Sequence, residues 1–193
     1  MRLDHARYEI GSLLGEGGNG KVMSGTRRTD RLPVALKYIP ISKIVDWQTQ
    51  DDDPTLTTRV PLEAALLKRA QSIPSVIRLI EYFELDADAE LAPCFVIVME
   101  RPDGVDLFTY LNGKNKNSYL EEVEASQVFA QALHIVIGLY LHGIVHCDIK
   151  DENFIIERQT GKIKIIDFGC GAFLKRRTDY PDFFYTFRGT IVV

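Results

Sequence analysis

The stretch His146-Cys147-Asp148-Ile149-Lys150-Asp151-Glu152-Asn153, followed later by Asp167-Phe168-Gly169, decides how this sequence is interpreted. Phosphoryl transfer needs a carboxylate that orients the acceptor hydroxyl, a cation near the transferred group, and oxygen ligands for magnesium. Asp148 is the candidate for the first role, Lys150 for the second, and Asn153 with Asp167 for the third. Magnesium prefers few carboxylates together with phosphate oxygens and water, which suits this sparse set. Each residue alone could be a polar turn residue, but the ordered set favours a phosphotransfer site.

A glycine-rich segment lies far upstream, Gly15-Glu16-Gly17-Gly18-Asn19-Gly20-Lys21-Val22. Glycines let a backbone approach phosphate oxygens closely and offer unobstructed amide donors. Such a segment alone is equally typical of an ordinary glycine-rich turn. A dinucleotide-binding site requires a helix to open at the third glycine, whereas strand-like sequence follows here. The pattern therefore predicts a β-hairpin that forms a lid over phosphates.

A short strand follows the lid, because Pro33 introduces the apolar run of residues 34–39. The alternation of side chains along a strand places Ala35 and Lys37 on one face. We expect Ala35 and Val22 to cover a flat ring and Lys37 to meet its phosphates, with Glu63 on the next helix as the counter-charge. The alternatives are a strand lysine whose ammonium group extends into solvent and an ordinary exposed helical glutamate.

The first half of the chain otherwise alternates strands with turns. We expect strands at residues 8–14, 21–27, 76–85 and 94–99, and an exposed loop after Asp51. Residues 61–70 suit a helix with Pro61 in its first turn. Residues 102–104, Pro-Asp-Gly, mark a bend and are the best candidate for a hinge between two lobes.

The second half begins with a helix. Ser118 and Glu121 form a plausible capping box at its start. Apolar residues then follow at helical spacing and predict a buried stripe that ends at Gly143: Phe129, Leu133, Val136 and Tyr140. Residues 154–156 and 162–166 predict a hairpin around Thr160-Gly161.

The composition of the 193 residues, 46% hydrophobic and 26% charged, is that of a soluble globular protein. A formal net charge of -4 gives no electrostatic case for nucleic-acid binding. Cys94, Cys147 and Cys170 form no CxxC pair, which favours reduced thiols in the cytoplasm or nucleus. The charged N-terminus excludes a signal peptide, and the longest apolar stretch, residues 135–141, is too short for a bilayer. We expect neither nucleic acid nor membrane as a partner.

Together, the lid, Val34-Ala35-Leu36-Lys37, the catalytic loop and Asp-Phe-Gly resemble the motif set of eukaryotic protein kinases. Lys150, two places after Asp148, resembles the serine/threonine rather than the tyrosine kinases. More narrowly, the chain is similar to the PIM serine/threonine kinases over nearly its whole length. The supporting stretches are residues 42–47, 58–63, 76–79, 100–102 and 148–153.

The resemblance implies an α+β, bilobal kinase fold that binds ATP between its lobes. It implies an N-lobe at residues 1–101, complete and rich in β-structure, and a partial, mainly helical C-lobe at residues 102–193. Met99 would be the gatekeeper and residues 100–102 the hinge, where Pro102 cannot donate a backbone hydrogen bond. The residues that would contact ATP are Leu14, Gly15, Gly17, Gly20, Val22, Ala35, Lys37, Met99, Glu100, Pro102, Ile155 and Ile166.

The implied activity is that of a serine/threonine protein kinase that uses ATP and Mg²⁺. PIM kinases favour basic substrates, and Asp106, Asp151 and Glu152 match the acidic positions that would receive them. Each could equally be a solvated surface carboxylate. The resemblance implies a monomer for the complete protein.

Two features depart from the family pattern. Cys147 replaces an arginine that commonly pairs with a phosphorylated activation loop, so ordering by phosphorylation is not expected. The chain stops at Val193, where an activation segment should continue, which implies a truncated C-lobe and exposed apolar residues along 129–140. The alternative function is a nucleotide-binding or scaffold module without useful catalysis, and the alternative origin is an incomplete gene model.

Overall fold

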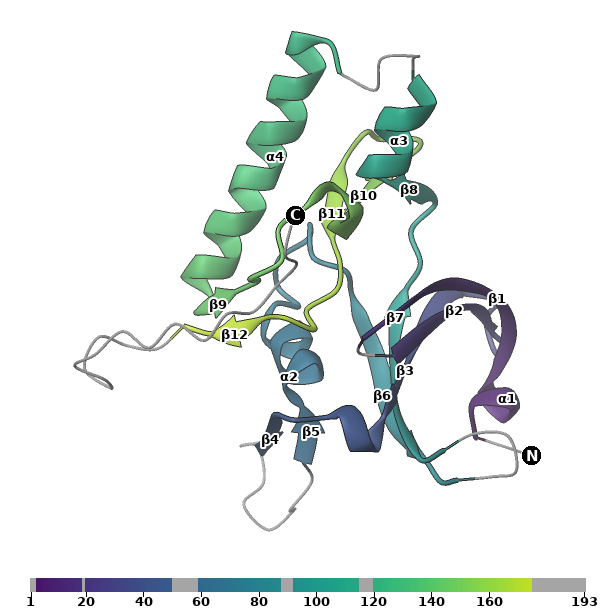
Figure 1. Cartoon of the computed structure of the whole chain (residues 1–193). Coiled ribbons are helices and arrows are strands. Elements are labelled where there is room, and N and C mark those ends of the chain that lie inside the picture. The colour runs from purple at the N-terminus through teal and green to yellow at the C-terminus, as the bar shows by residue number, and fades with distance from the viewer. Residues whose placement is uncertain (1–2, 19, 50–58, 88–91, 115–119, 175–193) are drawn as a thin grey trace, which may run out of the picture. The chain divides into compact units, whose positions relative to one another are not determined.

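The computed structural model of the chain describes residues 3–18, 20–49, 59–87, 92–114 and 120–174 (Figure 1). Described residues of 1–65 and 78–102 form one compact unit, and those of 66–77 and 103–193 form a second. Residues 66–77 thus group with the later part of the chain. The predicted division between residues 101 and 102 places them with the earlier part. The loop predicted after Asp51 and the residue Ser118 lie outside the described residues.

The first unit is built on a five-stranded antiparallel sheet in the order β1-β2-β3-β7-β6. Its strands are β1 (Tyr8–Gly17), β2 (Gly20–Arg27), β3 (Pro33–Pro40), β6 (Leu79–Leu85) and β7 (Cys94–Glu100). The unit also holds helix α1 (Leu3–Arg7), the 3-10 turn η1 (Ile41–Lys43), the paired strands β4 (Trp47–Thr49) and β5 (Arg59–Pro61), and the start of α2 (Leu62–Arg69).

One face of this sheet carries the core of the first unit. Its buried side chains are Tyr8, Val34, Leu36, Tyr38, Leu85, Cys94, Val96 and Val98. Because side chains alternate along a strand, this core leaves Ala35 and Lys37 on the opposite face of β3. The strands predicted at 8–14, 21–27, 34–39 and 94–99 are confirmed.

Two predicted boundaries in this region are wrong. Pro61 ends strand β5, where it pairs with Trp47, and the helix begins only at Leu62. The strand predicted at 76–85 begins at Leu79. Residues before it pair elsewhere, because Ile77 N–H donates to Ile165 O at 3.0 Å and Ile165 N–H donates to Ser75 O at 2.9 Å.

The second unit combines helices with small sheets. It contains β8 (Gly104–Asp106), α3 (Leu107–Lys114), α4 (Glu122–Leu141), β9 (Ile144–Val145), the 3-10 turn η2 (Asp151–Asn153), β10 (Phe154–Glu157), β11 (Ile163–Ile165) and β12 (Ala172–Phe173). The strand orders are β11-β10-β8 and β12-β9. The predicted hairpin around Thr160-Gly161 is confirmed as β10 and β11.

The predicted buried stripe of α4 is wrong. Phe129 and Tyr140 are 70% and 61% exposed, and Leu133 and Val136 are exposed as well. The buried residues of this helix are Val128, Ile135 and Leu139. The helix α4 has apolar stripes on two sides. Helical spacing identifies each stripe but does not indicate which of the two is buried. Phe129, Leu133, Val136 and Tyr140 are exposed, as the resemblance implied, whereas Ile135 and Leu139 are buried.

The start of α4 also differs from expectation. Glu121 is the N-cap, with no capping hydrogen bond from its side chain, so it is not the third residue of a capping box. None of the helices in the described part of the chain combines the length and apolarity needed to cross a bilayer.

Candidate active site

The glycine-rich segment forms the predicted hairpin turn between β1 and β2. Gly20 has φ +132°, and a Cβ there would lie 2.1 Å from the carbonyl oxygen of Tyr38, so only glycine fits. A Cβ at Gly15, Gly17 or Gly18 would meet nothing within 4 Å. Packing therefore does not require these three glycines, and their open backbone suits close approach by a ligand.

Lys37 and Glu63 form a buried ion pair in the first unit. Lys37 Nζ donates to Glu63 Oε1 at 2.7 Å, and the two residues are only 5% and 6% exposed. The predicted counter-charge is thus in place. A buried charge that loses its partner costs about 3–5 kcal/mol, so each residue holds the other in position.

The face of the sheet that carries Lys37 also gathers the residues expected around adenine. In antiparallel strands, directly opposed residues share a face. Val22 opposes Lys37 across β2 and β3, and Ala35 opposes Met99 across β3 and β7. Since Ala35 and Lys37 are two apart on β3, all four residues lie on one face. Their contacts with adenine stay a prediction.

Residues 100–102, the hinge that the resemblance implies, have no backbone N–H available to a ligand. Glu100 N–H donates to Arg78 O at 2.9 Å, Arg101 N–H donates to Pro33 O at 3.2 Å, and Pro102 has no N–H. The Glu100 carboxylate itself accepts from Arg78 N–H at 3.1 Å. A ring that binds to this segment can therefore donate to its carbonyl groups but cannot accept from its amides.

Asp148 is the centre of the polar cluster in the second unit. Asn153 Nδ2 donates to Asp148 O at 2.8 Å and to Asp148 Oδ2 at 2.9 Å. Lys150 Nζ lies 3.0 Å from the same Oδ2, and this hydrogen bond raises the pKa of Lys150 above its usual value. The cluster therefore combines an oriented carboxylate with an adjacent permanent cation.

The His146 side chain positions this cluster by accepting a hydrogen bond from Asp148 N–H, a role that was not predicted from the sequence. The side chain is buried, its Nε2 lies 2.9 Å from Ile166 O, and Asp148 N–H donates to its Nδ1 at 3.3 Å. Its ring also packs edge-on against Phe168, with 4.9 Å between ring centroids. Burial lowers the pKa of His146, so the ring is neutral at pH 7 with its proton on Nε2. The position of His146 two residues before Asp148 was the available signal.

The residues expected to hold magnesium lie close together. Ile166 N–H donates to Asn153 O at 2.9 Å, which places Asp167, the next residue, beside Asn153. Because Asn153 Nδ2 makes both hydrogen bonds to Asp148, its Oδ1 is the atom left for a cation. Asp167 has φ +58°, and its Oδ1 accepts from Gly169 N–H at 3.2 Å. One amide oxygen and one carboxylate fit Mg²⁺, which completes its shell with phosphate oxygens and water.

The remaining predicted residues occupy several elements. In β10, Ile155 lies opposite Asp106 of β8. The Asp106 carboxylate accepts from Thr109 N–H and from Thr109 Oγ1, both at 2.7 Å, so it also stabilises the start of α3. Asp151 and Glu152 begin η2. Leu14 is half-exposed on β1. Binding of ATP or substrate by these residues and by Ile166 stays a prediction.

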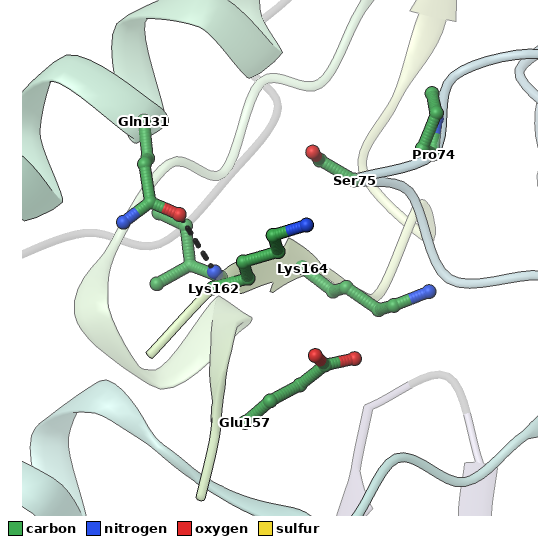
Figure 2. Close-up of a pocket in the computed structure, with 7 residues that line it drawn as sticks. Pro74, Ser75, Gln131, Glu157, Lys162 and Lys164 are labelled. Carbon is green, nitrogen blue, oxygen red and sulfur yellow. Dashed lines mark hydrogen bonds between the residues drawn. The ribbon is translucent and has the colours of Figure 1, made fainter. Parts of the chain in front are cut away.

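The second unit also has a hollow of about 420 Å³, and its lining includes none of these residues (Figure 2). It is lined by Pro74, Ser75, Gln131, Glu157, Lys162, Ile163 and Lys164. In Figure 2, the Gln131 side chain accepts from Ile163 N–H, at 3.1 Å. None of its lining residues was predicted to serve catalysis, and this hydrogen bond fixes α4 to β11.

Comparison with known proteins agrees with this geometry. The family model described as protein kinase domain matches residues 8–191. The serine/threonine-protein kinase pim-2 of Danio rerio is 37% identical over 92% of this chain. Serine/threonine-protein kinase prk-2 of Caenorhabditis elegans is 33% identical over 91% of it.

A third relative, the PAS domain-containing serine/threonine-protein kinase of Mus musculus, is 36% identical over 96% of this chain. The matched regions make up 56% of pim-2, 37% of prk-2 and 12% of the mouse protein. The chain thus corresponds to a part of each relative. The family match at residues 8–191 includes the glycine-rich turn, the Lys37–Glu63 pair and the Asp148 cluster. On the match of residues 8–191, the chain belongs to the protein kinase family.

Proposed function

We propose that this chain carries the ATP-binding and catalytic residues of a PIM-type serine/threonine protein kinase, which transfers the γ-phosphoryl group of ATP to protein substrates. The observation that carries the proposal is the Asp148 carboxylate, held by Asn153 at 2.9 Å and by Lys150 at 3.0 Å. A carboxylate held by two neighbouring groups keeps one orientation, as a group that positions an acceptor hydroxyl must.

In this proposal Asp148 accepts the hydrogen bond, and then the proton, of the substrate hydroxyl. Its Oδ2 accepts from Asn153 and lies 3.0 Å from Lys150 Nζ, and these contacts orient the carboxylate for that role. Lys150 stays protonated, since its pKa is raised, and its charge offsets negative charge that develops beside Asp148. Neutral His146 keeps the loop in place through Asp148 N–H.

Asn153 and Asp167 would hold Mg²⁺, and Lys37, with the glycine-rich turn, would meet the phosphates of ATP. Bound Mg²⁺ supplies positive charge that neutralises the phosphate oxygens. The open backbone at Gly15 and Gly17 supports a lid role for the turn. The buried contact with Glu63 supports a fixed position for the Lys37 ammonium group.

The proposed substrates are proteins with basic residues near the acceptor serine or threonine. The net charge of -4 and the carboxylates of Asp106, Asp151 and Glu152 support this preference. Reduced Cys94, Cys147 and Cys170 support a location in the cytoplasm or nucleus. The complete protein is proposed to be a monomer.

The test is transfer of phosphate from Mg-ATP to a basic serine peptide. We expect Asp148→Asn to lower turnover by about 10²–10⁴-fold, because the proton acceptor is lost. Asp103→Asn is the matched control, since Asp103 is an exposed carboxylate paired with Arg158 at the surface. Equal turnover for Asp148→Asn and Asp103→Asn would contradict the proposal.

The second candidate is a nucleotide-binding or scaffold module without useful catalysis. The exposed apolar side chains of α4, Phe129 and Tyr140 among them, favour this candidate because such patches mark association surfaces. A thermal shift with Mg-ATP separates the two functions. Stabilisation by Mg-ATP without phosphate transfer would favour the module, and stabilisation together with transfer would favour the kinase.

A further inference from the structure

Two cysteines flank a short pair of strands beside the catalytic loop, since Cys147 follows β9 and Cys170 precedes β12. Strands β9 and β12 pair in antiparallel register, with Val145 opposite Ala172 and Ile144 opposite Phe173 (Figure 1). Leu174 N–H donates to Gly143 O at 2.7 Å, so the same register continues one residue beyond the pair of Ile144 and Phe173. In the other direction the pairing ends at Val145 and Ala172, and Cys147 and Cys170 each lie two residues beyond that last pair.

The two backbones stay close beyond the last paired residues. A Cβ on Gly171 would lie 3.3 Å from the carbonyl oxygen of Val145. The sulfur of Cys147 lies 3.8 Å from that same oxygen. A disulfide requires Cα atoms about 4.4–6.8 Å apart. The strand pair and the contact of Gly171 with Val145 O hold the two segments that carry the cysteines side by side.

Local backbone geometry and exposure also distinguish this pair. Cys147 has φ +63°, and Cys170 is the third residue of a turn closed by Gly171 N–H and Phe168 O at 2.9 Å. Both cysteines are half-buried, whereas Cys94 is only 2% exposed. All three are reduced in the structure. An oxidant from solvent can thus reach Cys147 and Cys170 but not Cys94.

We propose that Cys147 and Cys170 form a reversible disulfide when the protein meets a peroxide. One sulfur attacks a peroxide oxygen, the O–O bond breaks, and water leaves, which gives a sulfenic acid. The second thiol attacks that sulfur, the S–S bond forms, and a second water leaves. The two sulfurs together give two electrons to the peroxide. A dithiol reductant returns both cysteines to thiols.

The disulfide would join two segments on which the proposed function depends. Cys147 immediately precedes Asp148, and Cys170 immediately follows Gly169, whose N–H donates to the Asp167 carboxylate. The bond pulls on both segments at once and displaces these carboxylates from their reduced positions. Because a displacement of about 1 Å can cost about 10²-fold in rate, oxidation lowers turnover. This regulatory part rests on the proposed kinase function, whereas the disulfide itself does not.

The chemical test uses the full chain, purified in reduced form and treated with hydrogen peroxide, then alkylated and mapped as peptides without reduction. We expect a cross-linked peptide of Cys147 and Cys170, lighter by two hydrogens and lost on treatment with dithiothreitol. Cys94→Ser is the matched control and keeps the cross-link, whereas Cys147→Ser and Cys170→Ser abolish it. Separate oxidation or alkylation of Cys147 and Cys170 in a folded wild-type chain, with no cross-link, overturns the proposal. Circular dichroism shows that each variant is folded.

The functional test measures peptide phosphorylation before oxidation, after it, and after reduction. We expect turnover to fall by about tenfold or more on oxidation and to recover with dithiothreitol, with a smaller change in Cys170→Ser. Equal turnover of the cross-linked and reduced chains overturns the regulatory part. Absence of transfer in the reduced chain would contradict the proposed function instead, while the peptide map still decides whether the disulfide forms.

Discussion

Two lysine–carboxylate pairs among the described residues, Lys37–Glu63 and Lys150–Asp148, differ in how far they are buried. The side chains of Lys37 and Glu63 are 7% and 6% exposed, with 2.7 Å between Nζ and Oε1. Those of Lys150 and Asp148 are 30% and 10% exposed, with 3.0 Å between Nζ and Oδ2. Each charge of the Lys37–Glu63 pair needs its partner for stability, because too little water reaches either group to solvate it alone. Partial exposure leaves the second pair open to other molecules, as a catalytic group must be.

The buried pair gives the largest expected effect on stability. Glu63→Gln leaves the Lys37 ammonium group buried without its counter-charge, so we expect a loss of about 3–5 kcal/mol in the free energy of unfolding. Urea denaturation measures this loss. Glu84→Gln, the same change at an exposed position of β6, is the matched control and should change stability by no more than about 0.5 kcal/mol. Similar losses in the two variants would remove the distinction between the two pairs.

The His146 ring, which accepts a hydrogen bond from Asp148 N–H, gives an intermediate expected effect on stability, and this effect depends on pH. Burial is the main cause of the lowered pKa of His146, and the nearby Asp148 and Asp167 carboxylates oppose it only in part. The unfolded chain, with a pKa near 6.5, then binds a proton more readily than the folded chain. Stability is therefore full above that pH and decreases as the pH falls below it, by at most about 1.4 kcal/mol per pH unit for this group.

Denaturation between pH 5 and pH 8 measures that dependence. His146→Gln removes the titrating group, so its stability should vary less with pH than that of the wild type. His134→Gln, a change on the exposed side of α4, is the matched control and should keep the wild-type dependence. An unchanged pH dependence in His146→Gln would show that burial of this ring does not control the stability of the catalytic loop.

The partly exposed Lys150–Asp148 pair gives the smallest expected effect on stability and a clear effect on turnover. Lys150→Met should change the free energy of unfolding by no more than about 1 kcal/mol, because Lys150 is 30% exposed and Asn153 Nδ2 still donates to the Asp148 carboxylate. Turnover should nevertheless fall, since the cation beside Asp148 is lost. Lys162→Met, at an exposed position of the second unit, should leave both quantities unchanged. A stability loss as large as that of Glu63→Gln would contradict the comparison.

Prediction from sequence succeeded where one local pattern determined one outcome. The alternation in β3 separated Val34 and Leu36, which are buried in the core, from Lys37 on the other face. It failed on α4, where Ile135 rather than Leu133 is buried. Both residues belong to apolar stripes of the same helix, and only the packing of α4 against Ile73 and β11 selects one of them.

The sequence by itself determined the family, the order of the chemical groups and the pairing of charges that the first unit needs. These follow from residue type and spacing along the chain, which fix which groups are near one another locally. Only the tertiary structure decided that neutral His146 supports Asp148 and that the pairing of β9 with β12 brings the segments of Cys147 and Cys170 together. Both depend on how β9 pairs with β12 and on which side chains become buried. Both contacts are set by the packing of the whole unit. The position of His146 two residues before Asp148 was a local signal for the first, and no local pattern indicates the second.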